Sequence, residues 1–262
     1  MIQYSCLRVV LASAIVQLRE MSASLFNLFI MLVQPFFIAV LAIYMLRHRP
    51  DFDATYVVVG TGLSGLLSVT LLTSSGTITR ERAQGNLELL VASPTPLIMV
   101  FSGKTLATLA FSLTTMALSY AVGAWVFRQP VAIHAPAAFS LSLLLALVSL
   151  WAMGMLFAPL SIVWPPAHGF LQGLEYPVFI LCGFLFPLLL LPGWVLPLSY
   201  ALPPYWAARA LHGTSSESLP MGETVIAWAI LLATSALALW LAAVLLGVFL
   251  KRARQKGVLG FV

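Results

Sequence analysis

The chain has 262 residues, of which 61% are hydrophobic and 8% are charged, and its formal net charge is +5. Roughly a quarter of the residues of a soluble protein are charged, so this composition excludes an ordinary soluble domain and indicates a membrane protein. We interpret the positive charge as a bias of the segments that face the cytosol, and we expect no nucleic-acid binding.

Residues 1–20 are predicted to form a helix that lies in the membrane surface. Its apolar residues recur at helical spacing, as in interfacial helices, and form a stripe of Tyr4, Leu7, Leu11, Ile15 and Leu18. A signal peptide needs about 7 to 15 apolar residues after its basic end, whereas only Val9, Val10 and Leu11 separate Arg8 from the small residues at 12–14. We therefore expect no cleavage in this segment.

Runs without charged residues are long enough to give six transmembrane helices, because one span needs about 20 apolar residues. The predicted spans cover residues 22–46, 55–79, 96–127, 137–163, 170–191 and 224–250. Nine of the 13 Lys and Arg residues then lie on the side of the N-terminus, which places both termini in the cytosol. The basic run at 251–256 is expected to meet anionic lipid headgroups. The fold class is an all-α membrane protein with one transmembrane domain over residues 1–262.

The most charged passage of the chain lies between the second and third predicted spans. Residues 81–92 are expected to form an amphipathic helix with Glu81 and Glu88 on its polar face. Gly85 weakens the middle of this helix, and Pro94 ends it because the residue before a proline avoids α geometry. An apolar face that no span requires favours docking against a partner, and the alternative is a solvated loop.

The fifth predicted span begins beside an acidic residue and is followed by a broken apolar segment. Glu175 is expected near the inner headgroups, where the helix N-terminus favours a carboxylate, and a role in gating or substrate contact is the alternative. Residues 193–212 are apolar but interrupted by prolines. Backbone of this kind occurs at membrane depth only where protein or water covers it, so we expect short re-entrant helices between spans five and six.

Short motifs in the apolar runs resemble active sites of other protein classes. Gly60, Ser64 and Ser68 recur every four residues and predict a small-residue face that another helix can approach closely. The "GLSG" at 62–65 resembles the nucleophile motif of rhomboid-type intramembrane proteases, and that class is our alternative function. A serine nucleophile needs a positioned base. We disfavour the protease because every histidine falls at or beyond the end of a predicted span, namely His48, His134, His168 and His212.

Neither a nucleotide site nor a metal site is expected in this chain. "SGKT" at 102–105 lacks the first glycine of a phosphate-binding loop, and Lys104 is expected to reach the inner headgroups from the start of a span. Asp51 and Asp53 lie beside His48, but a short outer hairpin loop accounts for them. Any ATP or Mg²⁺ that the protein uses would be held by another polypeptide.

Two separated passages resemble the type-2 permeases of ATP-binding-cassette (ABC) exporters. The first is "RERAQGNLELLVASPTPLIMVFSGK", which has the family's arginine-glutamate, glycine, proline and glycine-lysine positions. The second is "YPVFILCGFLFPLLLLPGWVLPLSYALPPYWAARAL", at 176–211, in which Gly183 and Phe186 fall at matching places together with the re-entrant-region residues Pro187, Pro192, Trp194, Pro204, Tyr205 and Arg209. Pro203 departs from the asparagine that is usual in the family.

The resemblance implies a coupling helix at 81–92 that sits in a groove of a separate ATPase subunit. Two permeases, identical or paralogous, would form one exporter with two ATPase copies, in the inner membrane of a bacterium. The implied coupling residues are Arg80, Glu81, Arg82, Gly85, Leu87, Glu88, Leu90, Val91 and Pro94. The implied pathway residues are Phe26, Phe29, Phe37, Ser64, Ser68, Glu175, Phe179 and Phe186. The substrate is left open among drug-like, lipid and lipid-linked or polysaccharide molecules.

Overall fold

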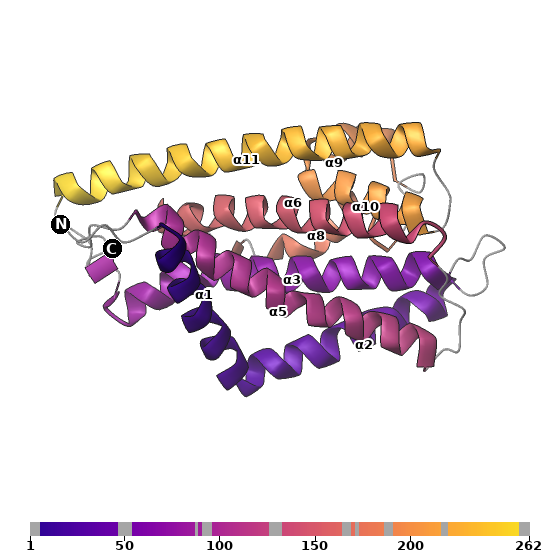
Figure 1. Ribbon diagram of the computed structural model, residues 1–262, viewed down its shortest axis with the longest axis horizontal. Helices are drawn as coiled ribbons and strands as arrows, with labels where there is room; N and C mark the ends of the chain where they lie inside the picture. The colour runs from indigo at the N-terminus through magenta and orange to yellow at the C-terminus, as the bar shows by residue number, and fades with distance from the viewer. Residues whose placement is uncertain are drawn as a thin grey trace.

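The computed structural model describes residues 6–46, 54–86, 89–90, 96–125, 133–163, 169–170, 173–185, 191–215 and 220–256, and these residues contain helices and turns but no strand. Five long helices form the body of the part of the chain that the structure describes. They are α2 (Leu25–Leu46), α3 (Ala54–Ala83), α5 (Leu97–Trp125), α6 (Pro136–Val163) and α11 (Met221–Lys256). Figure 1 shows α3, α5, α6 and α11 running side by side along the long axis.

Four of these helices are long and apolar enough to cross a membrane, within the part of the chain that the structure describes. The segments are Thr55–Ser74, Leu97–Ala121, Pro136–Phe157 and Met221–Val248. Helix α2 has 22 residues and carries no charge. Its passage through the membrane, the six-span topology and the orientation stay predictions.

Helix α3 is the centre of the bundle. Its membrane segment is 89% buried, whereas that of α11 is 28% buried. The buried hydroxyls of α3 can lie in this central position because they donate to carbonyls of their own helix, as Thr61, Ser64 and Thr70 do. Small residues bring its neighbours close, because a Cβ added to Gly154 of α6 would lie 2.7 Å from both Ser74 Oγ and Thr105 Cγ2. Helices α3, α5 and α6 therefore meet with little side-chain volume between them.

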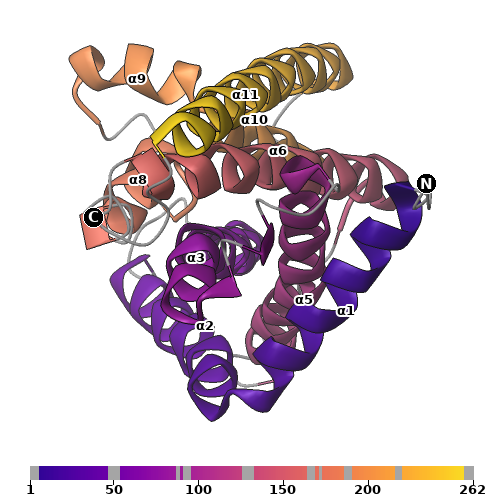
Figure 2. The same ribbon diagram turned by 90° about the vertical axis from the view of Figure 1, so that its left-hand side faces the viewer.

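Helix α1 (Cys6–Ala23) crosses the bundle instead of running along it, as Figures 1 and 2 show. It packs on α5 through a face that includes Ser13, and a Cβ on Gly103 would lie 2.1 Å from Ser13 Oγ. The predicted apolar stripe points away from the protein, with exposed side chains at Leu7, Leu11, Ile15 and Leu18. Tyr4 lies outside the described residues. An outward apolar face suits a helix at the membrane surface.

The predicted span 170–191 is not one continuous helix in the described residues. Helix α8 covers only Glu175–Leu181, and Gly183 follows with φ +66°. The Phe184 N–H donates to the Phe179 carbonyl at 3.2 Å and the Gly183 N–H donates to the Ile180 carbonyl at 3.1 Å. This pair of bonds is a Schellman motif, which ends a helix at a left-handed glycine. The prediction of a continuous fifth helix was therefore wrong, because the helix ends near the middle of the predicted span.

Short helices follow, as expected, between this region and α11. They are the 3₁₀ turn η2 (Gly193–Val195), α9 (Leu196–Ala201) and α10 (Pro203–Ser215). Leu202 separates α9 from α10 in an extended conformation, because the residue before a proline avoids α geometry. Helix α10 packs on α6 and α11, at the end of the bundle where both of these helices begin (Figure 1). The depth of these helices in a membrane stays a prediction.

Candidate functional site

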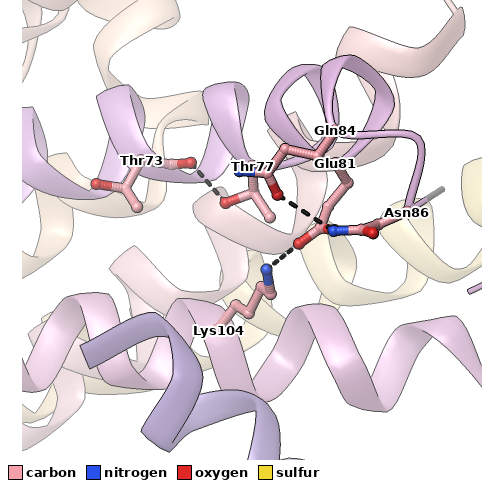
Figure 3. Close-up of polar contacts among 6 residues, drawn as sticks. All are labelled: Thr73, Thr77, Glu81, Gln84, Asn86 and Lys104. Atoms are coloured by element: carbon pink, nitrogen blue, oxygen red, sulfur yellow. Dashed lines mark hydrogen bonds and ion pairs between the residues drawn. The ribbon is translucent and has the colours of Figure 1, made fainter. Parts of the chain in front are cut away.

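A buried ion pair joins the last turn of α3 to the first turns of α5. Lys104 Nζ donates to a carboxylate oxygen of Glu81, and the two side chains are 8% and 9% exposed (Figure 3). The sequence had predicted that Glu81 faces a partner and that Lys104 reaches the headgroups. Both expectations were wrong, because α3 continues past the predicted span and turns Glu81 towards α5.

The predicted helix at 81–92 is divided at Gly85. Residues 81–83 belong to α3. Gly85 has φ +72°, a left-handed conformation that ends a helix and that glycine adopts without strain. Arg80 is exposed on the last turn of α3. The side chain of Arg82 and the residues Leu87, Glu88, Val91 and Pro94 lie outside the described part of the chain. The role of these residues in coupling stays a prediction.

Two neighbouring leucines in the connection between α3 and α5 face opposite ways. Leu90, which was expected to anchor a partner, is half-buried and packs against the bundle's own cluster around Leu97 and Phe101. Leu89 is 71% exposed. Among the described residues of this connection, Leu89 is therefore an apolar side chain that a partner could reach, and its exposure was not predicted from the sequence.

Helix α8 is fixed to α3 at its first residue. Glu175 is 5% exposed and its Oε1 accepts a hydrogen bond from Ser68 Oγ, which is itself fully buried. The prediction that Glu175 faces the inner headgroups was wrong, because α8 packs directly on α3. Ser68 therefore donates a hydrogen bond to a buried carboxylate and does not line an open pathway.

A second set of contacts fixes the other end of α8. A Cβ on Gly60 would lie 1.8 Å from the Phe184 carbonyl oxygen, so only glycine allows this approach. The Tyr56 hydroxyl donates to the Gly183 carbonyl at 2.7 Å. The Tyr56 ring also stacks on His212 of α10, with centroids 3.7 Å apart. The small-residue face at Gly60 and Ser68 thus receives a neighbour, as predicted.

Ser64 lies between these two anchors and is fully buried. Its hydroxyl donates to the Gly60 carbonyl of its own helix at 2.9 Å. A nucleophilic serine would instead give its proton to a positioned base. This bond does not support the protease alternative.

An aromatic cavity of about 670 Å³ lies between α2 and α8. Two of the predicted pathway residues, Phe37 and Phe179, meet in its wall, together with Leu41, Tyr44, Tyr176 and Leu185. Phe29 is 62% exposed and does not belong to this lining. The side chain of Phe26 and the whole of Phe186 lie outside the described residues.

The expected re-entrant residues divide into exposed and buried groups. Trp194 is 80% exposed, whereas Tyr205 and the neighbouring Trp206 are only 8% and 9% exposed. They are buried because α10 packs against α6 and α11. Arg209 Nη2 lies 2.9 Å from Glu223 Oε2 and its guanidinium lies 5.8 Å from the Trp206 ring. Pro192 precedes η2 and Pro204 is buried in α10, while Pro187 lies outside the described residues.

Among the residues that the structure describes, no three His, Cys, Asp or Glu side chains gather as metal ligands. Asp51, Asp53 and His48, which had been weighed as a metal site, are not among them.

Comparison with known proteins places the chain in a family. Residues 8–214 match the family described as ABC-2 type transporter. Because the match covers most of the chain, the protein belongs to this family of membrane subunits. It is similar to "Probable multidrug ABC transporter permease YbhR" of Escherichia coli K12 and to the protein of the same name in Escherichia coli O157:H7. Identity to each is 25% over 157 residues, which cover 60% of this chain and 42% of the relative. The aligned region thus spans less than half the length of these relatives.

Proposed function

We propose that the chain is the permease subunit of an ABC exporter in the inner membrane of a bacterium, with six spans and both termini in the cytosol. It forms the substrate pathway as a dimer with a second permease, identical or paralogous. Separate ATPase subunits, one for each permease, bind ATP and Mg²⁺. The observation that carries this proposal is the family match over residues 8–214.

The bundle geometry supports a coupling role for the connection between α3 and α5. The end of α3, the start of α5 and the end of α11 lie at one end of the bundle, with α1 beside them (Figure 1). The buried Glu81 and Lys104 pair ties the two helices together directly beside the connection. A displacement of this connection by an ATPase therefore moves α3 and α5 as a unit.

ATP can drive such a displacement only if it binds better to a complex with one conformation of the permeases, because a ligand with equal affinity for both states shifts nothing. Exposed residues of the connection would make the contact with the ATPase, including Arg80 and Leu89, with Leu87, Glu88 and Val91 as further anchors. Pro94 and Pro96 would stiffen the link to α5.

The experiment is co-expression of the chain with the ABC ATPase encoded nearest to its gene, followed by co-purification and vanadate-sensitive export from cells. Leu87→Asp and Glu88→Ala should each lower substrate-stimulated ATP hydrolysis while the permease still inserts. Met221→Asp is the matched control, because Met221 is exposed at the opposite end of the bundle. Normal stimulation in both connection variants would refute the coupling role.

A further inference from the structure

We propose that a second cavity, between α3, α5 and α6, binds one acyl chain of a membrane phospholipid. Its volume is about 250 Å³, and we call it the α3–α5–α6 cavity. None of the predicted pathway residues lines it. The inference goes beyond transport, because it requires only that these three helices cross a membrane. The lining includes Val58 and Val59 of α3, Ala117 and Tyr120 of α5, and Phe139 and Leu143 of α6.

The α3–α5–α6 cavity lies at the end of the bundle where α3 and α6 begin and α5 ends (Figure 1). Val58 is three residues from the start of the apolar segment of α3, and Leu113 is eight residues from the end of that of α5. At a rise of about 1.5 Å per residue, the lining extends to about 12 Å from this end, and the hydrocarbon of one leaflet is about 15 Å thick. The cavity therefore lies at the depth of the acyl chains of one leaflet.

The cavity has a buried floor and an exposed rim. Val58 and Val59 are each 3% exposed, whereas Tyr120 is 44% exposed. Ala117 is also exposed and lies one turn before Tyr120, on the same face of α5. Both rim residues belong to the apolar segment of α5. In a membrane this rim faces lipid, so the molecule beside the opening is a phospholipid chain.

The lining favours hydrocarbon over water or a polar ligand. Eight of the nine lining residues are apolar, the ninth is Tyr120, and none is charged. A buried water needs two to four polar partners, and an engineered apolar cavity of roughly 150 Å³ stays dry and binds benzene. Sites for drug-sized molecules have larger volumes, about 300–1,000 Å³. A segment of an acyl chain therefore suits this cavity better than a headgroup or a drug-sized molecule.

The chain completes a packing that the protein achieves by itself elsewhere. At the other end of the same helices, a Cβ on Gly154 would lie 2.7 Å from both Ser74 Oγ and Thr105 Cγ2, so the helices meet directly. No glycine lines the α3–α5–α6 cavity, and the space between its side chains lacks such contacts. Inside a membrane, apolar groups associate through van der Waals packing. An acyl chain in the cavity supplies this packing to all three helices.

The test is photolabelling of the full chain in lipid nanodiscs that contain a phospholipid with a diazirine in the middle of one acyl chain. Mass spectrometry of the labelled peptides should find label at Val58 or Val59, which surrounding lipid does not reach because both are buried. Ala117→Phe places a ring in the rim and should remove this label. Ala121→Phe is the matched control, because Ala121 is also exposed on α5 but does not line the cavity. Label on Trp240, which is 62% exposed on α11, should persist in both variants and shows that they are inserted.

Four results would overturn the inference. The first is label confined to exposed residues of the unmodified chain, and the second is equal label at Val58 and Val59 in Ala117→Phe. The third is label at these valines from free palmitate carrying the diazirine but not from the phospholipid, which identifies a free fatty acid as the occupant. The fourth is complete cross-linking between two copies of Tyr120→Cys without label on α3, which shows that a second subunit covers the rim. Absence of vanadate-sensitive export would contradict the proposed function alone.

Discussion

Removing Lys104 should destabilise the protein far more than removing an exposed cation. Lys104→Met keeps the length of the side chain but leaves the Glu81 carboxylate buried without its partner. Both side chains are less than a tenth exposed, and breaking a buried pair on one side costs about 3–5 kcal/mol. In a protein of this size 1 kcal/mol corresponds to roughly 2–4 °C in Tm, so we expect a loss on the order of 10 °C.

The assay is thermal unfolding of the purified chain in detergent. Arg19→Met is the control, because Arg19 is exposed on α1 and surface substitutions change stability by about 0.5 kcal/mol or less. The double variant Glu81→Gln with Lys104→Met should recover most of the lost stability, since a neutral buried pair carries no uncompensated charge. If Lys104→Met is no worse than Arg19→Met, or if the double variant recovers nothing, the buried pair does not hold α3 to α5.

Three further substitutions probe the contacts of α3 and α10, each by the same unfolding assay. Gly60→Ala places a methyl group against the turn after α8 and should cost about 1–3 kcal/mol, whereas Gly247→Ala, which meets open space, should be neutral or stabilising. Ser68→Ala removes a donor to a buried carboxylate and should cost about 1–3 kcal/mol; a smaller loss in Ser64→Ala is expected, because that hydroxyl bonds within its own helix. Arg209→Gln removes a partly exposed ion pair and should cost less than about 1 kcal/mol.

The long helices could be predicted because their signal is local. A charge-free run of sufficient length is a property of consecutive residues, and α3, α5, α6 and α11 each follow one such run. The signal for the break between α9 and α10 at Leu202 is also local, because the residue before a proline avoids α geometry. In the same way, the exposed stripe of α1 followed from helical spacing alone.

The pairings between helices could not be predicted from spacing. Glu81 and Lys104 are 23 residues apart in the chain. No local feature of the sequence indicates that α3 turns its last acidic residue towards α5. The end of α3 had a local signal that was misread, because Gly85 was treated as a weak point inside a helix and not as its end. Gly183 shows the same pattern, since a glycine that follows a short apolar helix is typical of a Schellman motif.

The contacts of α3 lead to one last prediction about transport. This helix pairs with α5 beside the connection at one end, through Glu81, and holds α8 through Ser68 and Tyr56 further along. Coupling between distant sites needs an element whose arrangement both sites bias, and α3 contacts α5 beside the connection and both α2 and α8 beside the aromatic cavity, while α5 also contacts α2. A motor that moves the connection should therefore change the affinity with which the aromatic cavity between α2 and α8 binds a ligand.

The probe is the aromatic dye rhodamine 6G, and the measurement is its Kd for the complex of permease and ATPase, without nucleotide and after trapping with ATP and vanadate. We expect Kd to change by about 5- to 150-fold on trapping, the range of typical coupling free energies. The neutral pair Glu81→Gln with Lys104→Met should reduce this ratio, because the bond that ties α3 to α5 beside the connection is weaker. An equal ratio in the double variant would show that the motor reaches the cavity by a route other than this contact.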